Sequence, residues 1–83
     1  MRYLIMCRSL TYAQKSAALL DRHGIGAGIS KAPAGLSPRG CAYCVTVSEQ
    51  SGRKAVQILR KYDQLFGEVY EQRDGNTYRE VAL

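Results

Sequence analysis

The chain has no long hydrophobic run: none of its apolar stretches approaches the roughly 20 residues that a membrane-spanning helix needs. Residues 1–8 contain a short apolar stretch, but they lack the longer apolar region and the small-residue cleavage site of a signal peptide. We therefore interpret this stretch as a first strand, and we expect a cytoplasmic protein with no membrane association.

Cysteine is scarce and odd in number, since the chain has only Cys7, Cys41 and Cys44. A secreted disulfide scaffold would have more cysteines, usually an even number, so free thiols in a reducing compartment are the simpler interpretation. Zinc normally takes four ligands, and the chain offers one close cysteine pair, a remote cysteine and the single histidine His23. The sequence therefore predicts no metal site, and it indicates no cofactor.

The length of 83 residues allows one domain with one core, which we assign to residues 1–83. A chain of this size buries only roughly two-thirds of the surface that it exposes when unfolded. Because little stability remains for a deep active site, a carrier, a binding module or a small subunit is favoured over an enzyme. The net charge of +5 attracts polyanions, but the basic residues are spread from Arg2 to Arg79 and form no nucleic-acid-binding run.

The pattern of apolar and turn residues predicts two helices and five strands. The first half is expected to form a strand over 3–7, a helix that begins after Ser9 or Thr11 and ends at Gly24, a weak edge strand over 25–30 and a loop over 31–40. A strand over 41–48 follows, and then a helix that is capped by Ser48 or Ser51 and has an apolar stripe of Ala55, Ile58, Leu59 and Tyr62. The last two strands, over 68–72 and 77–81, flank the turn signal Asp74-Gly75-Asn76. Two helices on one side of a mostly antiparallel sheet define an α+β, ferredoxin-like βαββαβ plait, here with a C-terminal hairpin extension.

The loop over 31–40 is rich in proline and glycine and runs directly into an apolar strand, with a cysteine where the two meet. The thiolate is the reactive form of cysteine, and a nearby cation lowers the thiol pKa. Arg39 lies two residues before Cys41, and Gly40 leaves space for a bulky partner beside the sulfur. Cys41 is therefore a candidate reactive thiol, with Arg39 stabilising the thiolate. These residues alone favour the alternative, a small apolar residue at the start of a buried strand.

Cys44 completes a C-x-x-C spacing with Cys41 and is a candidate resolving thiol. In thioredoxin-like sites such a pair lies at a helix N-terminus, whereas here it opens a strand. Positions i and i+3 of a regular strand point to opposite faces, so a disulfide between the two requires irregular backbone. A dithiol redox site is therefore disfavoured, and Cys7, inside the first strand, is expected to be a core residue.

The order of these features resembles a small bacterial family of selenium/sulfur carrier-like proteins. The resemblance rests on the strand Tyr3-Leu4-Ile5-Met6, the helix end Gly24-Ile25, Pro33, Leu36-Ser37, and Gly40-Cys41 before an apolar strand and a second amphipathic helix. The characteristic cysteine of the family falls on Cys41. The family often has glycine after this cysteine where the chain has Ala42, and Cys44 is not expected in the family generally.

The resemblance implies a carrier rather than an enzyme. A persulfide or selenopersulfide would form on Cys41 by transfer from a protein donor such as a cysteine desulfurase. It would then pass to a protein acceptor.

Two alternatives remain open. RNA-recognition motifs share the element order, and Arg39-Gly40-Cys41-Ala42-Tyr43 partly fits their third strand, but Cys41 stands where a stacking aromatic is expected. Tyr43 also shares a strand face with Val45 and Val47, which suits packing, so nucleic-acid binding is disfavoured. The other alternative is a non-catalytic interaction subunit, including a homodimer, that pairs through the C-terminal hairpin with Tyr70 and Tyr78 available.

Overall fold

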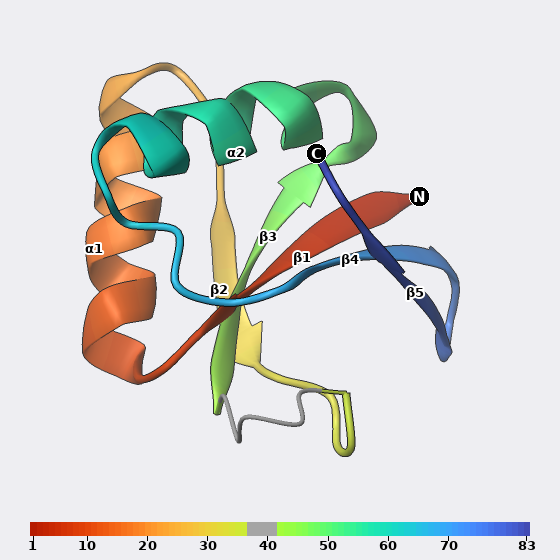
Figure 1. Ribbon diagram of the computed structural model, residues 1–83. Coiled ribbons are helices and arrows are strands. Elements are labelled where there is room, and N and C mark those ends of the chain that lie inside the picture. The colour runs from red at the N-terminus through yellow and green to blue at the C-terminus, as the bar shows by residue number, and fades with distance from the viewer. Residues whose placement is uncertain (37–41) are drawn as a thin grey trace.

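The computed structural model describes residues 1–36 and 42–83 as an α+β structure with a five-stranded antiparallel sheet and two α-helices (Figure 1). The elements are β1 (Arg2–Cys7), α1 (Leu10–Arg22), β2 (Gly28–Lys31), β3 (Tyr43–Ser48), the 3-10 turn η1 (Glu49–Ser51), α2 (Gly52–Lys61), β4 (Val69–Asp74) and β5 (Thr77–Val81). The strand order is β2-β3-β1-β4-β5, with β1 at the centre. This arrangement is compatible with a ferredoxin-like fold.

Helix α1 forms as its local sequence predicts. Ser9 is the N-cap, and its hydroxyl accepts a hydrogen bond from the backbone N–H of Tyr12 at 3.4 Å. Gly24 follows the helix with a φ of +80°, the left-handed conformation that glycine adopts without a Cβ clash. The start and end predicted for this helix are therefore confirmed.

Helix α2 begins as predicted, with Ser51 at its N-cap position, but it lacks a side-chain capping bond and its C-terminal end differs from the prediction. The side chains of Ser48 and Ser51 make no capping hydrogen bond, because η1 precedes the helix and the Ser48 hydroxyl instead donates to the Ser51 hydroxyl at 3.2 Å. Tyr62 was expected on the apolar stripe, but the helix ends at Lys61 and the Tyr62 side chain is 48% exposed. Val56, which the predicted apolar stripe did not include, is buried.

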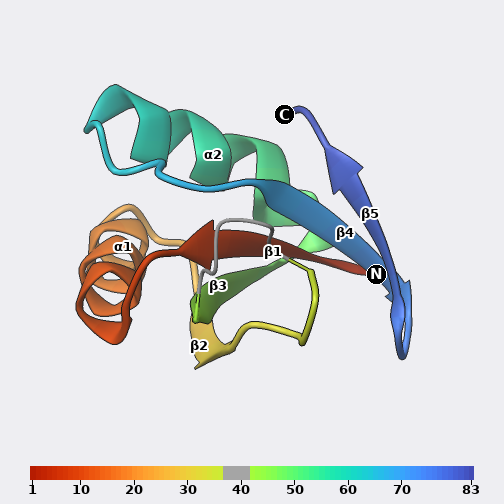
Figure 2. The same ribbon diagram turned by 60° about the horizontal axis from the view of Figure 1, so that its bottom comes forward.

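The centre of the sheet is buried on both faces, and successive residues of β1 alternate between two apolar clusters. On one face, Ile5 and Cys7 pack with the buried residues of both helices, which together form the helix-side cluster. On the other face, Leu4, Met6, Cys44 and Tyr70 form a smaller group, the second-face cluster. Figure 2 shows the two helices on one side of the sheet and the segment after β2 on the other.

One carboxylate is buried where β4 meets β5. Glu71 lies opposite Arg79 in the strand register, and its side chain is only 4% exposed. Arg73 Nε and Arg79 Nη2 donate to the same oxygen, Glu71 Oε1, at 2.8 and 2.9 Å. The hydrogen bond from Arg73 is the main cause that lowers the pKa of Glu71. The contact with Arg79 thus joins β5 to β4 through charged, paired groups.

Within the described residues, no helix is long and apolar enough to span a bilayer.

Candidate functional site

The predicted reactive residues Arg39, Gly40 and Cys41 lie outside the described residues. The structure defines the two flanks from which their segment leaves and re-enters the sheet. Lys31 pairs with Tyr43 at the end of the β2–β3 ladder, and the backbone N–H of Ala32 donates to the carbonyl of Ala42 at 2.9 Å. We call these four residues the neck. Ala42, which directly follows Cys41, is exposed.

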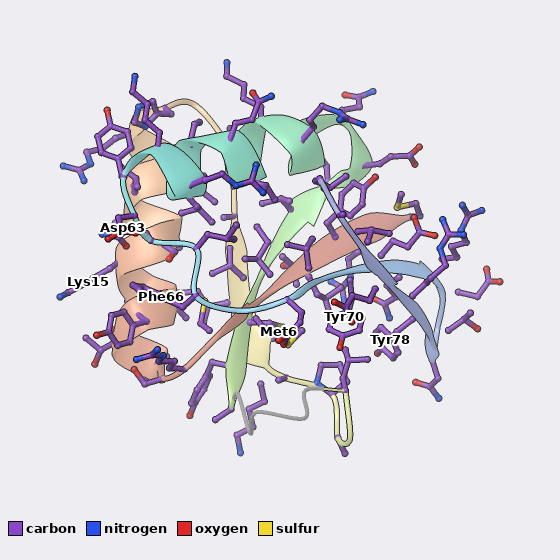
Figure 3. The ribbon with its side chains drawn as sticks, viewed as in Figure 1. Met6, Lys15, Asp63, Phe66, Tyr70 and Tyr78 are labelled. Carbon is purple, nitrogen blue, oxygen red and sulfur yellow. The ribbon has the colours of Figure 1, made fainter. Side chains whose placement is uncertain are left out.

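From the neck residue Ala32 onward, the chain folds back over the second face of the sheet. Residues 32–36, the cover segment, place Ala32 and Leu36 against the second-face cluster. The Tyr70 hydroxyl donates to the carbonyl of Leu36 at 2.7 Å, which joins this segment to β4. Figure 3 shows Met6 and Tyr70 close together in this region, with Tyr78 beyond them. The cover segment therefore seals a sheet face that would otherwise expose apolar side chains.

Cys44 lies beneath this cover. Its side chain is 0% exposed, and its sulfur is 3.4 Å from the Ser30 hydroxyl. Burial raises the pKa of the Cys44 thiol above the ordinary value, while the Ser30 hydroxyl and the charge of Arg2 act in the opposite direction. The native structure thus holds Cys44 as a protonated, inaccessible thiol. Its role as a resolving thiol stays a prediction, and it requires the sulfur to become exposed.

Cys7 is confirmed as a core residue. Its side chain is 3% exposed in the helix-side cluster, and its sulfur lies 3.6 Å from the carbonyl oxygen of Ile5. Cys7 and Cys44 thus occupy opposite faces of the sheet. Among residues 1–36 and 42–83, no group of three or more potential ligands from His, Cys, Asp and Glu could hold a metal ion.

Of two aromatic residues in the alternative hypotheses, Tyr43 is partly buried and Tyr70 is buried. Tyr43 packs against the helix-side cluster, as its shared face with Val45 and Val47 predicted. Its ring is therefore not presented as an open stacking platform, and RNA binding is not favoured. Tyr70 is 7% exposed and bonded to Leu36, so of the two hairpin tyrosines only Tyr78 is partly accessible.

Sequence reasoning missed the cover segment and its bond to Tyr70. The available signal was the run of four consecutive apolar residues, Leu4 to Cys7, because a strand that is apolar on both faces needs a second covering layer. Nothing local to residues 32–36 identifies them as that layer, since Leu36 and Tyr70 are 34 positions apart.

Replacing Tyr70 by phenylalanine should expose Cys44 selectively. Loss of the bond to Leu36 removes about 1 kcal/mol from the closed state, which raises the open population about fivefold. The measurement is the alkylation rate of Cys44 under native conditions in a Cys41→Ser background. Cys7 is the internal control because it is equally buried under the helices. Equal acceleration at both cysteines, or none at Cys44, would contradict a local role for this bond.

Comparison with known proteins identifies the family. The family model described as "Putative Se/S carrier protein-like" matches residues 2–71, and the chain belongs to this family. The match spans β1 to the middle of β4 and includes the neck and the predicted reactive segment. No curated protein and no solved structure matches the chain.

Proposed function

We propose that this protein carries sulfur or selenium as a persulfide or selenopersulfide on Cys41. A protein donor such as a cysteine desulfurase loads the thiol, and a protein acceptor unloads it. The observation that carries the proposal is the family match, whose span of residues 2–71 contains Cys41. The burial of Cys7 and Cys44 supports it, because reaction at either of these thiols would require the fold to open.

The transfer step needs no oxidant and no cofactor. The Cys41 thiolate attacks the terminal sulfur of a donor persulfide, so that one S–S bond forms while the donor's own S–S bond breaks. The donor leaves as a thiolate, and the terminal S–H proton stays on the transferred sulfur. Unloading is the same exchange in reverse, toward an acceptor thiolate. A terminal selenium follows the same course. Within this scheme Arg39 stabilises the Cys41 thiolate and Gly40 gives the partner access.

The proposed setting is a ferredoxin-like plait with β5 as its hairpin extension, acting as a non-enzymatic carrier in the cytoplasm. A reducing compartment suits the role, because it keeps thiols free between transfers. Pairing of two copies through the C-terminal hairpin stays a prediction.

Thiol labelling across pH with an intact-mass readout tests this function. We expect the native protein to take one label, at Cys41, with a rate that follows a pKa below about 8.5, the ordinary value for cysteine. Cys44 should stay unlabelled over the same range, because burial raises its pKa. The denatured chain, with three free cysteines, provides the control for complete labelling. A Cys41 that titrates like an ordinary cysteine would count against the carrier.

A further inference from the structure

The net charge of the protein resides entirely in its first 48 residues. This part contains six basic residues against a single acidic one, Asp21, whereas residues 49–83 contain six of each. The first 48 residues form β1, α1, β2 and β3, the elements that surround the neck. A positive field is therefore expected where the Cys41 segment leaves the sheet.

One basic residue, Lys31, belongs to the neck, and another, Arg8, lies beside it. Tyr43 pairs with Lys31 on one side and with Cys7 on the other, and Arg8 directly follows Cys7. Neighbouring strands lie about 4.8 Å apart, so the backbones of Lys31 and Cys7 are about 10 Å apart. This backbone spacing is similar to the Debye length of about 10 Å at 0.1 M salt, so we expect the side-chain charges of Arg8 and Lys31 to contribute to one local field. Both Lys31 and Arg8 are exposed.

Aromatic contacts fix the positive charge along α1. The Arg8 guanidinium lies 5.4 Å from the centre of the Phe66 ring, and the Phe66 and Tyr12 rings meet edge to face at 4.8 Å. The Lys15 ammonium lies 5.9 Å from the centre of the Tyr12 ring. Figure 3 shows Lys15 and Phe66 on the α1 side of the molecule. We call Arg8, Lys15 and Lys31 the basic rim.

Among residues 1–36 and 42–83, no ion pair joins Arg8, Lys15 or Lys31 to an acidic side chain. Glu68 is the acidic residue closest in sequence to Phe66, and its side chain is partly buried. Of the other acidic residues, Asp21 lines the same surface hollow as Lys15, and Figure 3 shows Asp63 on the same α1 side as Lys15. The rest lie in η1 and in the β4–β5 hairpin: Glu49, Glu71, Asp74 and Glu80. At the neck, the exposed rim cations Arg8 and Lys31 therefore present positive charge to an approaching partner.

We propose that the basic rim docks an acidic surface of the partner protein. On the partner, this acidic surface surrounds the sulfur or selenium atom that Cys41 receives or donates. This inference rests on the proposed carrier function and specifies its partner. A protein suits the rim better than RNA does. The Tyr12 and Phe66 rings meet edge to face and are covered by cations, so they leave no open platform on which bases can stack.

The probes are two synthetic peptides that carry a cysteine activated as its 2-pyridyl disulfide. One has aspartates on both sides of the cysteine, and the other has serines at the same positions. Release of pyridinethione gives the rate constant for formation of the mixed disulfide with Cys41. We expect the aspartate peptide to react about tenfold faster at low salt, and we expect this preference to shrink as salt is added.

Charge-reversal variants assign the preference to the rim. Lys31→Glu and Arg8→Glu should each remove most of the preference for aspartate, and Lys31→Glu changes only an exposed side chain on an edge strand. Arg53→Glu is the matched control, because it makes the same charge change on the exposed face of α2, beyond the opposite end of β3. This control should keep the preference.

The outcomes separate the two proposals. If neither peptide reacts at Cys41, the carrier function fails. If both peptides react at equal rates, or if Arg53→Glu has the same effect as Lys31→Glu, Cys41 is reactive but the acidic docking surface is wrong. A third outcome is that a mixed-sequence single-stranded RNA inhibits the reaction of the aspartate peptide at a lower concentration than a free aspartate-rich peptide does. In that case the rim is a nucleic-acid-binding surface, and this inference is overturned.

Discussion

Replacing Gly67 by alanine is expected to lower the free energy of unfolding by about 3 kcal/mol. A Cβ atom at this position would lie 2.7 Å from the Met6 carbonyl oxygen and 2.9 Å from the Met6 Cβ. Met6 is fully buried, and its backbone N–H donates to the carbonyl of Glu68 at 2.9 Å. Neither side of the contact can retreat without stretching this bond between β1 and the start of β4.

Thermal unfolding followed by circular dichroism measures the effect, with an expected fall in Tm of about 15 °C for a domain of this size. Gly26→Ala is the matched control, because a Cβ there meets nothing within 4 Å and its φ is not in the left-handed region. The control should be neutral or slightly stabilising. Equal losses in the two variants would show that the contact with Met6 does not constrain position 67.

Replacing Cys41 by serine is expected to abolish persulfide loading while leaving the fold intact. A serine hydroxyl supplies no thiolate, and the two remaining cysteines are 0% and 3% exposed. Loading is measured by intact mass after incubation with a cysteine desulfurase and free cysteine. The expected result is loss of the sulfur adduct with an unchanged unfolding midpoint.

Cys44→Ser separates the carrier from a dithiol redox site. A carrier keeps its adduct in this variant, because Cys44 is sealed beneath the cover segment in the native state. A redox pair needs both sulfurs, so its activity would be lost in either single variant. An adduct that persists in Cys41→Ser would move the acceptor role to another residue.

The parts of the fold that could be predicted are those with local causes. The Ser9 cap, the glycine after α1 and the turn between β4 and β5 each depend on a few neighbouring residues, and each is present. Ser51 stands at the N-cap position of α2 as predicted, but its hydroxyl makes no capping bond and accepts a hydrogen bond from Ser48 instead. Tyr62 was misplaced because the helix ends one residue before it.

The candidate site was predictable only in part, for the same reason. Cys7 in the core and Tyr43 on the helix side follow from the alternation along single strands. The cover over Cys44 and the basic rim depend on contacts between residues that are distant in sequence, such as Tyr70 with Leu36 and Arg8 with Phe66. Neither contact has a signature in either segment alone.

The hydrogen bond between Ala32 and Ala42 has a consequence for how such a protein can diversify. The two ends of the intervening segment are held to each other, so the strand register on either side does not depend on that segment's length. Lengthening a loop whose ends are already joined costs little entropy, about 0.6 kcal/mol for each doubling. The sheet can therefore keep its register when residues are inserted after Leu36, as long as residues 32–36 still cover the second face.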